Sequence, residues 1–153
     1  MSVRVVKIGG AALTDGSWLG AFADAVAAAA DDLVIVHGGG PEISALSERL
    51  GVAVEWVDGR RVTPDAALDA ASMVLNGRVN KRLVSALITA GADAIGLSGE
   101  DGGLITAEVA AGGALGRVGH VGSVRSALLS MLIGAGMVPV IAPISRGPGG
   151  VAL

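Results

Sequence analysis

Two short apolar runs that end in glycine clusters constrain this chain more than any other feature. Residues 3–8 lead into Gly9-Gly10. Residues 33–37 lead into Gly38-Gly39-Gly40. Each pattern predicts a buried β-strand that ends in a loop without side chains. Such a loop lets backbone N–H groups approach an anion closely, and Lys7 adds a positive charge beside the first loop. The sequence therefore predicts a phosphate-handling site.

The residues that follow each loop predict helices. Ser17 is expected to cap a helix that runs to about Ala30. Pro41 suits the first turn of a short helix over 42–50. The opening thus has a βαβα pattern, which predicts a parallel sheet with right-handed crossovers. Ligands bind such sheets at the carboxyl ends of the strands, where both glycine loops are expected.

The longest predicted helix runs over about residues 66–87. Its leucines and valines recur about every four residues, and Thr63-Pro64-Asp65 suits its start. Asn76-Gly77 lies inside this pattern and is expected to bend the helix or split it in two. Before the helix, residues 52–56 predict a weak strand and residues 57–62 an irregular segment.

The second half of the chain is expected to complete the sheet. Strands are predicted at 94–98 and 138–142, and residues 104–109 could pair with 116–121 as a hairpin. Residues 126–145 carry no charge and are long enough to span a membrane, but glycine and proline interrupt them, which favours a helix, a turn and a buried strand. The expected architecture is α/β, with a mostly parallel sheet and flanking helices in an αβα sandwich.

Composition excludes several classes of function. The net charge is −3 and the arginines are scattered, so no nucleic-acid partner is predicted. The chain has no cysteine, which excludes disulfides and thiolate metal or redox sites. His120 is too remote from His37 to predict a shared metal, so no metal ligands are proposed. The first residues lack the apolar stretch of a signal peptide, so a cytoplasmic location without a membrane partner is expected.

Four residues could carry chemistry, and each has a structural alternative. Lys7 could act as a point charge on a phosphate or be a surface lysine, and the second glycine loop favours the phosphate role. His37 could be catalytic, but a lone histidine at a strand end is more often structural. Arg61 could clamp a carboxylate or lie in a solvated basic turn, which the pattern alone favours. Asp101 is favoured as a turn former over an active-site acid.

Several segments, in the same order along the chain, resemble the amino-acid kinase family. They are Val6-Lys7-Ile8-Gly9-Gly10, residues 34–41, Asp58-Gly59-Arg60-Arg61-Val62-Thr63, residues 76–81, residues 94–99 with Asp101-Gly102, and Gly116-x-Val118-Gly119. The resemblance spans Val3 to about Pro143. It is greatest to the members that phosphorylate N-acetyl-L-glutamate in arginine biosynthesis, and it implies the fold of that family.

The resemblance implies ATP-dependent transfer of a γ-phosphoryl group, with Mg²⁺, to the side-chain carboxylate of N-acetyl-L-glutamate, giving an acyl phosphate. By the same resemblance, Lys7 would steady the transferring phosphoryl group, and the backbone of Gly9 and Gly10 would donate hydrogen bonds to it. Gly38 and Gly39 would line the acceptor side of the cleft. Arg61 would hold the acceptor's α-carboxylate, and the helix over 66–87 would form a homodimer interface.

The chain also departs from the family. Family members are longer and continue into an Asn-x-Asn-Ala-Asp motif that begins a nucleotide-binding lobe, which has no counterpart here. Residues 1–153 are therefore expected to form a single domain, the acceptor-binding and dimerisation lobe, truncated before the lobe that supplies most ATP and Mg²⁺ contacts. Two alternatives stay open. One is a related aminoadipate-type kinase of lysine biosynthesis, and the other is a non-catalytic module that binds an acylated amino acid or mediates oligomerisation.

Overall fold

The structure is a computed structural model that describes residues 3–29, 32–53 and 55–153. The strands are β1 (Val3–Ile8), β2 (Asp32–His37), β3 (Glu55–Val57), β4 (Arg60–Val62), β5 (Ala94–Ser98), β6 (Ile105–Val109), β7 (Gly119–Val124) and β8 (Val138–Ala142). The helices are α1 (Gly16–Ala27), α2 (Gly40–Arg49), α3 (Asp65–Ser72), α4 (Asn80–Thr89) and α5 (Ser126–Gly134).

The central sheet is parallel, as the βαβα pattern predicts. Its strand order is β1-β2-β8-β5, so β8, the last strand in the sequence, lies between β2 and β5. Val140, Ile141 and Ala142 of β8 are at most 3% exposed, because strands and helices cover β8 on every side. The carboxyl ends of β1 and β2 meet at one edge of the sheet, and this edge carries both glycine loops.

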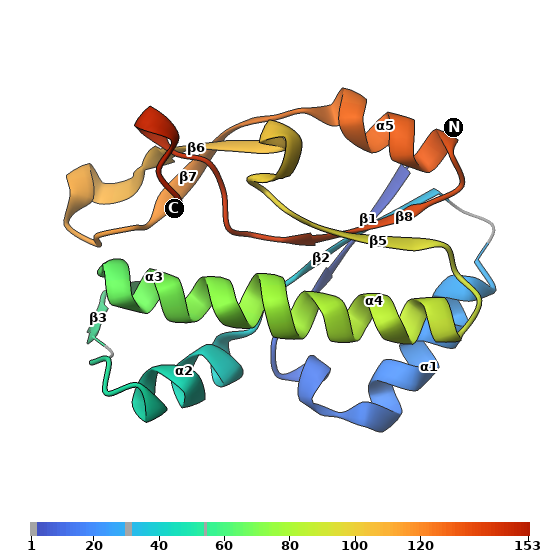
Figure 1. The fold of residues 1–153 in the computed structure, drawn as a ribbon, viewed down its shortest axis with the longest axis horizontal. Coiled ribbons are helices and arrows are strands. Elements are labelled where there is room, and N and C mark those ends of the chain that lie inside the picture. Colours follow the sequence, from blue (N-terminus) through green and yellow to red (C-terminus); the bar gives the residue numbers. More distant parts are fainter. Residues whose placement is uncertain (1–2, 30–31, 54) are drawn as a thin grey trace.

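Helices cover the sheet on two faces (Figure 1). Ile35 and Val140 pack with α1 and α4 in the larger apolar core, whereas Val34 and Ile141 face α5 in a smaller one. Neighbouring residues of one strand point to opposite faces, so this alternation gives the sheet a helical layer on each side. The fold is thus the predicted α/β sandwich of a mostly parallel sheet and flanking helices.

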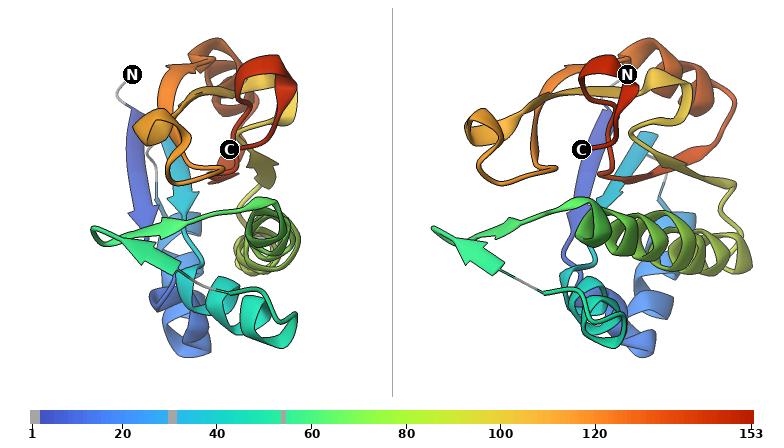
Figure 2. Two further views of the ribbon diagram at one scale, coloured as in Figure 1. Left: turned by 90° about the vertical axis from the view of Figure 1, so that its left-hand side faces the viewer. Right: turned by 60° about the vertical axis from the view of Figure 1, so that its left-hand side comes forward.

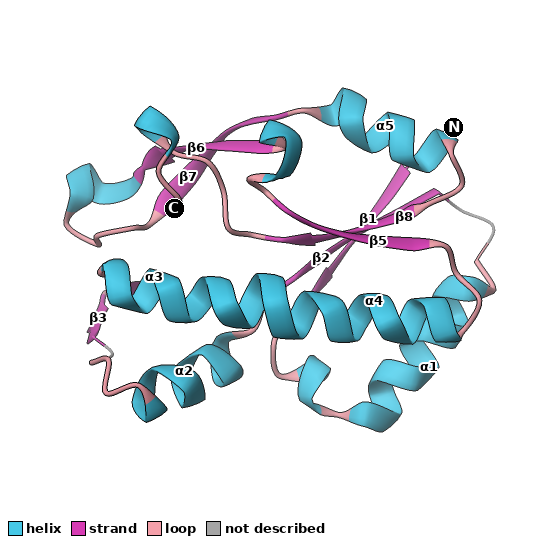
Figure 3. Cartoon of the chain, viewed as in Figure 1, coloured by secondary structure: helices cyan, strands magenta, loops and turns pink. Residues whose placement is uncertain are grey.

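The helix expected to bend at Asn76-Gly77 continues without a break (Figure 3). The connection between α3 and α4 is a π-helical segment, Met73–Val79. A π-turn accommodates an extra residue inside a helix, so the glycine widens the helix locally and does not end it. Val74, Leu75 and Val79 are buried at this point, and their packing against the core keeps both halves in line.

Two local predictions need correction. Helix α1 is capped by Asp15, not Ser17: the Asp15 carboxylate accepts hydrogen bonds from the backbone N–H groups of Ser17 and Trp18. The segment 57–62 is not irregular, because β3 and β4 pair as an antiparallel hairpin that projects from the rest of the chain (Figure 2). Its turn residues Asp58 and Gly59 both have positive φ, as type I′ turns require. Ala30, the expected end of the first helix, and Val54 lie outside the described residues.

The later predictions are confirmed with one shift. Strands β6 and β7 form the expected hairpin, but the second strand begins at Gly119 and not at Gly116. A Cβ on Gly116 would lie 2.5 Å from the Thr63 carbonyl oxygen, so the glycine allows this chain crossing. Residues 126–145 form α5, a turn and β8, as their glycines and proline indicate. Among the described residues, no helix combines the length and apolar character needed to cross a bilayer.

Candidate functional site

The two glycine loops touch each other at the ends of β1 and β2. The Gly38 backbone N–H donates to the Ile8 carbonyl oxygen at 2.9 Å. A Cβ on Gly10 would lie 2.8 Å from Gly39 Cα and 2.8 Å from Gly40 N, which is closer than carbon and nitrogen atoms can approach. A side chain at Gly10 would therefore force the loops apart. The structure brings the predicted phosphate loop and the predicted acceptor loop into direct contact.

Lys7 and Gly9 lie at the open side of this contact. Lys7 is exposed on β1, with Val36 of β2 as its neighbour in register. Gly9 is exposed, and a Cβ built there would have no atom within 4 Å. The backbone of the loop is therefore exposed to solvent at Gly9. Lys7, two residues earlier, carries an ammonium group. This arrangement can accept an anion without moving a side chain.

His37 has the structural role that a lone histidine at a strand end favours. It is 2% exposed, and its Nε2 lies 3.1 Å from Asn80 Nδ2 on α4. The Asn80 amide donates to Nε2, so the proton of the neutral ring sits on Nδ1, which lies 3.1 Å from the Gly38 carbonyl oxygen. Burial lowers the pKa of His37 from its ordinary value, although the hydrogen bond to Gly38 acts in the opposite direction. His37 thus fixes the start of the second glycine loop as a neutral ring.

Arg61 is held by helix α2 and by the β3–β4 hairpin. Its Nη2 donates to Ser44 Oγ at 2.6 Å, and its guanidinium carbon lies 5.3 Å from the centre of the Trp56 ring. Arg61 Nη1 is buried and has no hydrogen-bond partner in the structure. Buried donors are nearly always paired, so this open donor marks Arg61 as a candidate binding residue. Arg61 is therefore not a wholly solvated turn residue.

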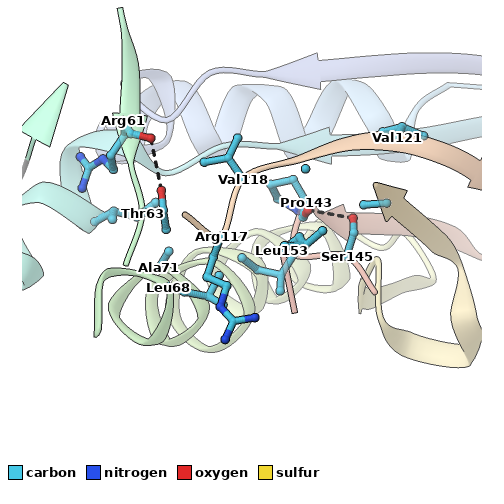
Figure 4. Close-up of a pocket in the computed structure, with 14 residues that line it drawn as sticks. Arg61, Thr63, Leu68, Ala71, Arg117, Val118, Val121, Pro143, Ser145 and Leu153 are labelled. Atoms are coloured by element: carbon cyan, nitrogen blue, oxygen red, sulfur yellow. Dashed lines mark hydrogen bonds between the residues drawn. The ribbon is translucent and has the colours of Figure 1, made fainter. Parts of the chain in front are cut away.

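A cavity of about 350 Å³ adjoins Arg61 (Figure 4). Its lining is mostly apolar and includes Ile43, Val118, Pro143 and Leu153. Figure 4 shows the Arg61 guanidinium directed away from Val118 and Pro143, so the charge lies at the rim of the cavity and not in its middle. The volume suits a small organic ligand, and an apolar wall with the cations of Arg61 and Arg117 at its rim suits an acylated amino acid.

The structure groups the predicted site residues in two places. Gly10 and Gly39 meet at the loop contact, whereas Arg61 lines the cavity and none of the loop glycines does. Helix α2 connects the two places, because it begins at Gly40 and its Ile43 lines the cavity. The loop contact and the cavity are therefore separated by about one turn of α2.

An ion pair of Arg117 and Asp65 lies beside the cavity, and Asp101 forms a turn after β5. At the other rim of the cavity, Arg117 Nε donates to Asp65 Oδ1 at 2.6 Å, and this hydrogen bond lowers the pKa of the Asp65 carboxyl. Asp101 is a turn former, as favoured by its sequence: its Oδ2 accepts from the backbone N–H and the hydroxyl of Ser98.

Three polar residues near the loops were missed by sequence reasoning. Asn80 and Arg82 of α4 reach the loop region, and Ser44 of α2 holds Arg61. Asn80 also donates to the Val140 carbonyl oxygen at 3.0 Å. In the sequence, Arg82 lies off the apolar stripe of the long helix. This position indicates a polar environment for Arg82 but does not predict which residues it contacts.

Comparison with known proteins points to one family. The sequence profile described as "Amino acid kinase family" matches residues 2–152. An acetylglutamate kinase of Chloroflexus aurantiacus is 48% identical over 148 residues, covering 95% of this chain and 58% of the relative. An acetylglutamate kinase of Roseiflexus sp. is 49% identical over 148 residues, covering 95% of this chain and 57% of the relative.

A solved structure gives the same result for the fold. The Streptococcus mutans UA159 protein smu.665 superposes with a TM-score of 0.85 at 29% identity, covering 99% of this chain and 62% of that one. The chain spans 49–58% of the length of these curated relatives, about half. With a family profile that matches nearly every residue and relatives close to half identical, the chain belongs to the amino acid kinase family.

Proposed function

We propose that the chain is the acceptor-binding and dimerisation lobe of an ATP-dependent kinase that phosphorylates the side-chain carboxylate of N-acetyl-L-glutamate. The observation that carries the proposal is the contact between the two glycine loops, with Arg61 and its cavity one helix turn away. The relatives named acetylglutamate kinase cover 95% of this chain, which favours this substrate over an aminoadipate-type homologue. We assign the reaction to the cytoplasm, where ATP is supplied.

In this proposal the two loops have different partners. An oxygen of the acceptor carboxylate attacks the γ-phosphorus, the bond to the β,γ-bridging oxygen breaks, and ADP leaves with that electron pair. Both reactants are anions, so the barrier falls when positive charge and N–H donors are fixed around the transferring group. Lys7 supplies the charge, and the Gly9-Gly10 backbone supplies the donors. Gly38-Gly39 positions the acceptor carboxylate on the other side.

Arg61 would hold the other end of the acceptor. Its unpaired Nη1 fits one oxygen of the α-carboxylate, while Nη2 stays on Ser44. The apolar wall of the cavity fits the acetyl and methylene groups of N-acetyl-L-glutamate. An amino acid with a free ammonium group would place a positive charge near Arg61, so the acylated form is preferred.

ATP with Mg²⁺ is the second substrate in this proposal. The fit of this chain is limited to the phosphoryl end, where the exposed Lys7 and the open Gly9 lie together. Within residues 3–29, 32–53 and 55–153, no group of three or more metal-ligating side chains is found. We therefore assign to this chain the phosphoryl and acceptor contacts, and leave the metal and adenine contacts to the part of the relatives that it does not span.

The long helix offers a surface for a second copy. Met73 and Ile88 on it are 60% and 55% exposed, although both are large and apolar. We propose that this surface forms a homodimer. Sedimentation velocity should give a dimer for the wild type and a monomer for Met73→Glu, with Asp69→Glu on the same helix as the control. A wild-type monomer would contradict the dimer but not the acceptor site.

One sample can test the function. Calorimetric titration with N-acetyl-L-glutamate should show binding to the chain, and ADP release from ATP should be measured on the same preparation. Binding without ADP release supports an acceptor lobe, and binding with turnover supports a kinase that is complete in this chain. If the chain binds an N-acylated aminoadipate more tightly, it is the related kinase. If it binds neither compound, the proposal is wrong.

A further inference from the structure

One arginine on α4 reaches both segments that carry the glycine loops. Arg82 Nη2 donates to Glu42 Oε1 at 2.6 Å and to the Leu13 carbonyl oxygen at 2.9 Å. Its Nη1 donates to Glu42 Oε2 at 3.3 Å. Leu13 lies in the 3₁₀ turn after the first loop, and Glu42 lies in the first turn of α2 after the second. A single side chain thus joins two segments that are far apart in the sequence.

Both acceptors of Arg82 are directly next to amides that bind the loop glycines. Leu13 follows Ala12, whose N–H donates to the Gly9 carbonyl oxygen at 3.2 Å. Glu42 precedes Ile43, whose N–H donates to the Gly39 carbonyl oxygen at 3.0 Å. Each residue that accepts a hydrogen bond from Arg82 is therefore the chain neighbour of a residue whose N–H binds a loop glycine.

The other end of Arg82 is rigid. Its neighbours Val79 and Leu83 are fully buried in the larger core, so α4 cannot move relative to the sheet without opening that core. Glu42 is 15% exposed and Arg82 is 36% exposed, so water screens the pair only in part. The planar guanidinium, with its fixed fork of donors, matches the carboxylate and the carbonyl together, which an ammonium group does not.

We propose that Arg82 is a positioning residue that sets the distance between the phosphoryl loop and the acceptor loop. The loops touch directly at Gly10 and Gly39, and Arg82 ties together the segments behind them. The two loops are thus connected at two points, by the Gly10–Gly39 contact and by the hydrogen bonds of Arg82. Two connections restrict the relative position of the loops more than one does. The assignment of the loops to phosphoryl group and acceptor rests on the proposed function, but the tie itself does not.

Nuclear magnetic resonance on the ¹⁵N-labelled chain tests the tie without any substrate. Arg82→Met keeps the length of the side chain and removes all its donors. We expect the amide signals of Gly9, Gly10, Gly39 and Gly40 to shift and their hydrogen exchange to accelerate, although the hydrogen bonds of Arg82 go to Leu13 and Glu42. Arg82→Lys should give smaller shifts in the same direction. Arg78→Met, at an exposed position of the same helix, is the control and should leave these signals in place.

The rest of the spectrum separates positioning from simple destabilisation. Signals of β6 and β7, which form a sheet separate from the central one, should stay in place in Arg82→Met. If the glycine signals stay in place as well, or if all signals shift together, Arg82 is not a positioning residue.

A titration with N-acetyl-L-glutamate then tests the consequence for the acceptor. Arg82→Met should weaken binding by about tenfold, and Arg78→Met should not. Unchanged affinity with displaced loops would overturn the role of Arg82 at the acceptor site. If the wild type does not bind N-acetyl-L-glutamate, the proposed function fails, while displaced glycine signals still support the tie.

Discussion

Asn80 Nδ2 lies 3.1 Å from His37 Nε2, and this hydrogen bond joins the long helix to the strand that leads into the second glycine loop. The same amide reaches the Val140 carbonyl oxygen on β8. Asn80 is 1% exposed, so water does not replace these bonds. The pair holds a helix and two strands together at the point where the second glycine loop begins.

Asn80→Ala should lower the free energy of unfolding by about 1–3 kcal/mol, because it leaves His37 Nε2 and the Val140 carbonyl without this donor in a buried place. Urea unfolding followed by circular dichroism would measure the difference. Asn76→Ala is the matched control, since Asn76 Oδ1 has no hydrogen-bond partner to lose. Equal losses in the two variants would contradict the role given to Asn80.

His37 should make stability depend on pH. Burial lowers the pKa of His37 in the folded chain, so the unfolded chain takes up a proton first as the pH falls through the ordinary value of 6.5. The free energy of unfolding should therefore decrease as the pH falls from about 7.5 to about 5.5, because the unfolded state binds more protons there. Thermal unfolding across this range measures the slope.

Two variants assign that slope to His37. His37→Gln does not titrate and keeps an acceptor for Asn80, so its slope should be smaller than that of the wild type. His120→Gln, at an exposed histidine, should keep the wild-type slope. If His120→Gln and not His37→Gln removed the slope, the assignment would be wrong.

The fold could be predicted from local patterns where one face of a segment decides its environment. The apolar runs 3–8 and 33–37 predict the parallel strands β1 and β2, and residues 126–145 predict a helix and a strand, all of which are present. Only β2 is buried as expected: β1 is an edge strand of the sheet, and Ile8 is its one buried residue. The order β1-β2-β8-β5 could not be predicted in this way. Strand order depends on contacts between segments that are distant in the sequence, and periodicity carries no information about them.

Local competition explains the smaller errors. Asp15 and Ser17 are both good caps, and the choice of Asp15 depends on where the 3₁₀ turn before it ends. Asp58-Gly59 is a strong signal for a two-residue turn, but the flanking strands have only three residues each, which is too short for a pattern of alternation. Asn76-Gly77 favours a break by propensity, and the core packing of Val74 and Val79 overrides it.

The candidate site was predictable only in its backbone part. Glycines that end two strands show from the sequence alone that a loop can approach an anion. The family resemblance points to Arg61, but the contacts of Arg61 with Ser44 and Trp56 depend on how the hairpin and α2 meet. Asn80 and Arg82 act through contacts 43 and 40 residues away, to His37 and Glu42, and such contacts leave no pattern in one sequence.

Gly10→Ala should destabilise the chain, since its methyl group would lie 2.8 Å from Gly39 Cα. Overpacking of backbone against a side chain costs about 1–3 kcal/mol, and we expect a loss of unfolding free energy in that range. Gly9→Ala is the neighbouring control, because a Cβ there meets no atom within 4 Å. Differential scanning calorimetry of both variants would settle the point, and a Gly9→Ala variant as unstable as Gly10→Ala would contradict the loop contact.

Arg61→Ala should weaken the binding of N-acetyl-L-glutamate by about 2–5 kcal/mol, because it removes the partner of a desolvated carboxylate. Isothermal calorimetry on the wild type and the variant gives this difference. Arg60→Ala, at the exposed neighbouring arginine of β4, should bind almost as the wild type does. A change of only a few tenths of a kcal/mol in Arg61→Ala would make Arg61 a residue of the hairpin surface with no part in binding.

The most direct test of the acceptor site is a titration of the ¹⁵N-labelled chain with N-acetyl-L-glutamate, followed by nuclear magnetic resonance. Our account predicts that the amide signals of Gly38 and Gly39 and the side-chain Nε signal of Arg61 shift together along one binding curve. Signals from Asp32 and Asp93, which line a separate cavity, should stay in place. Shifts confined to that other cavity, or no shifts at all at saturating ligand, would contradict the assignment of the glycine loops and Arg61 to the acceptor.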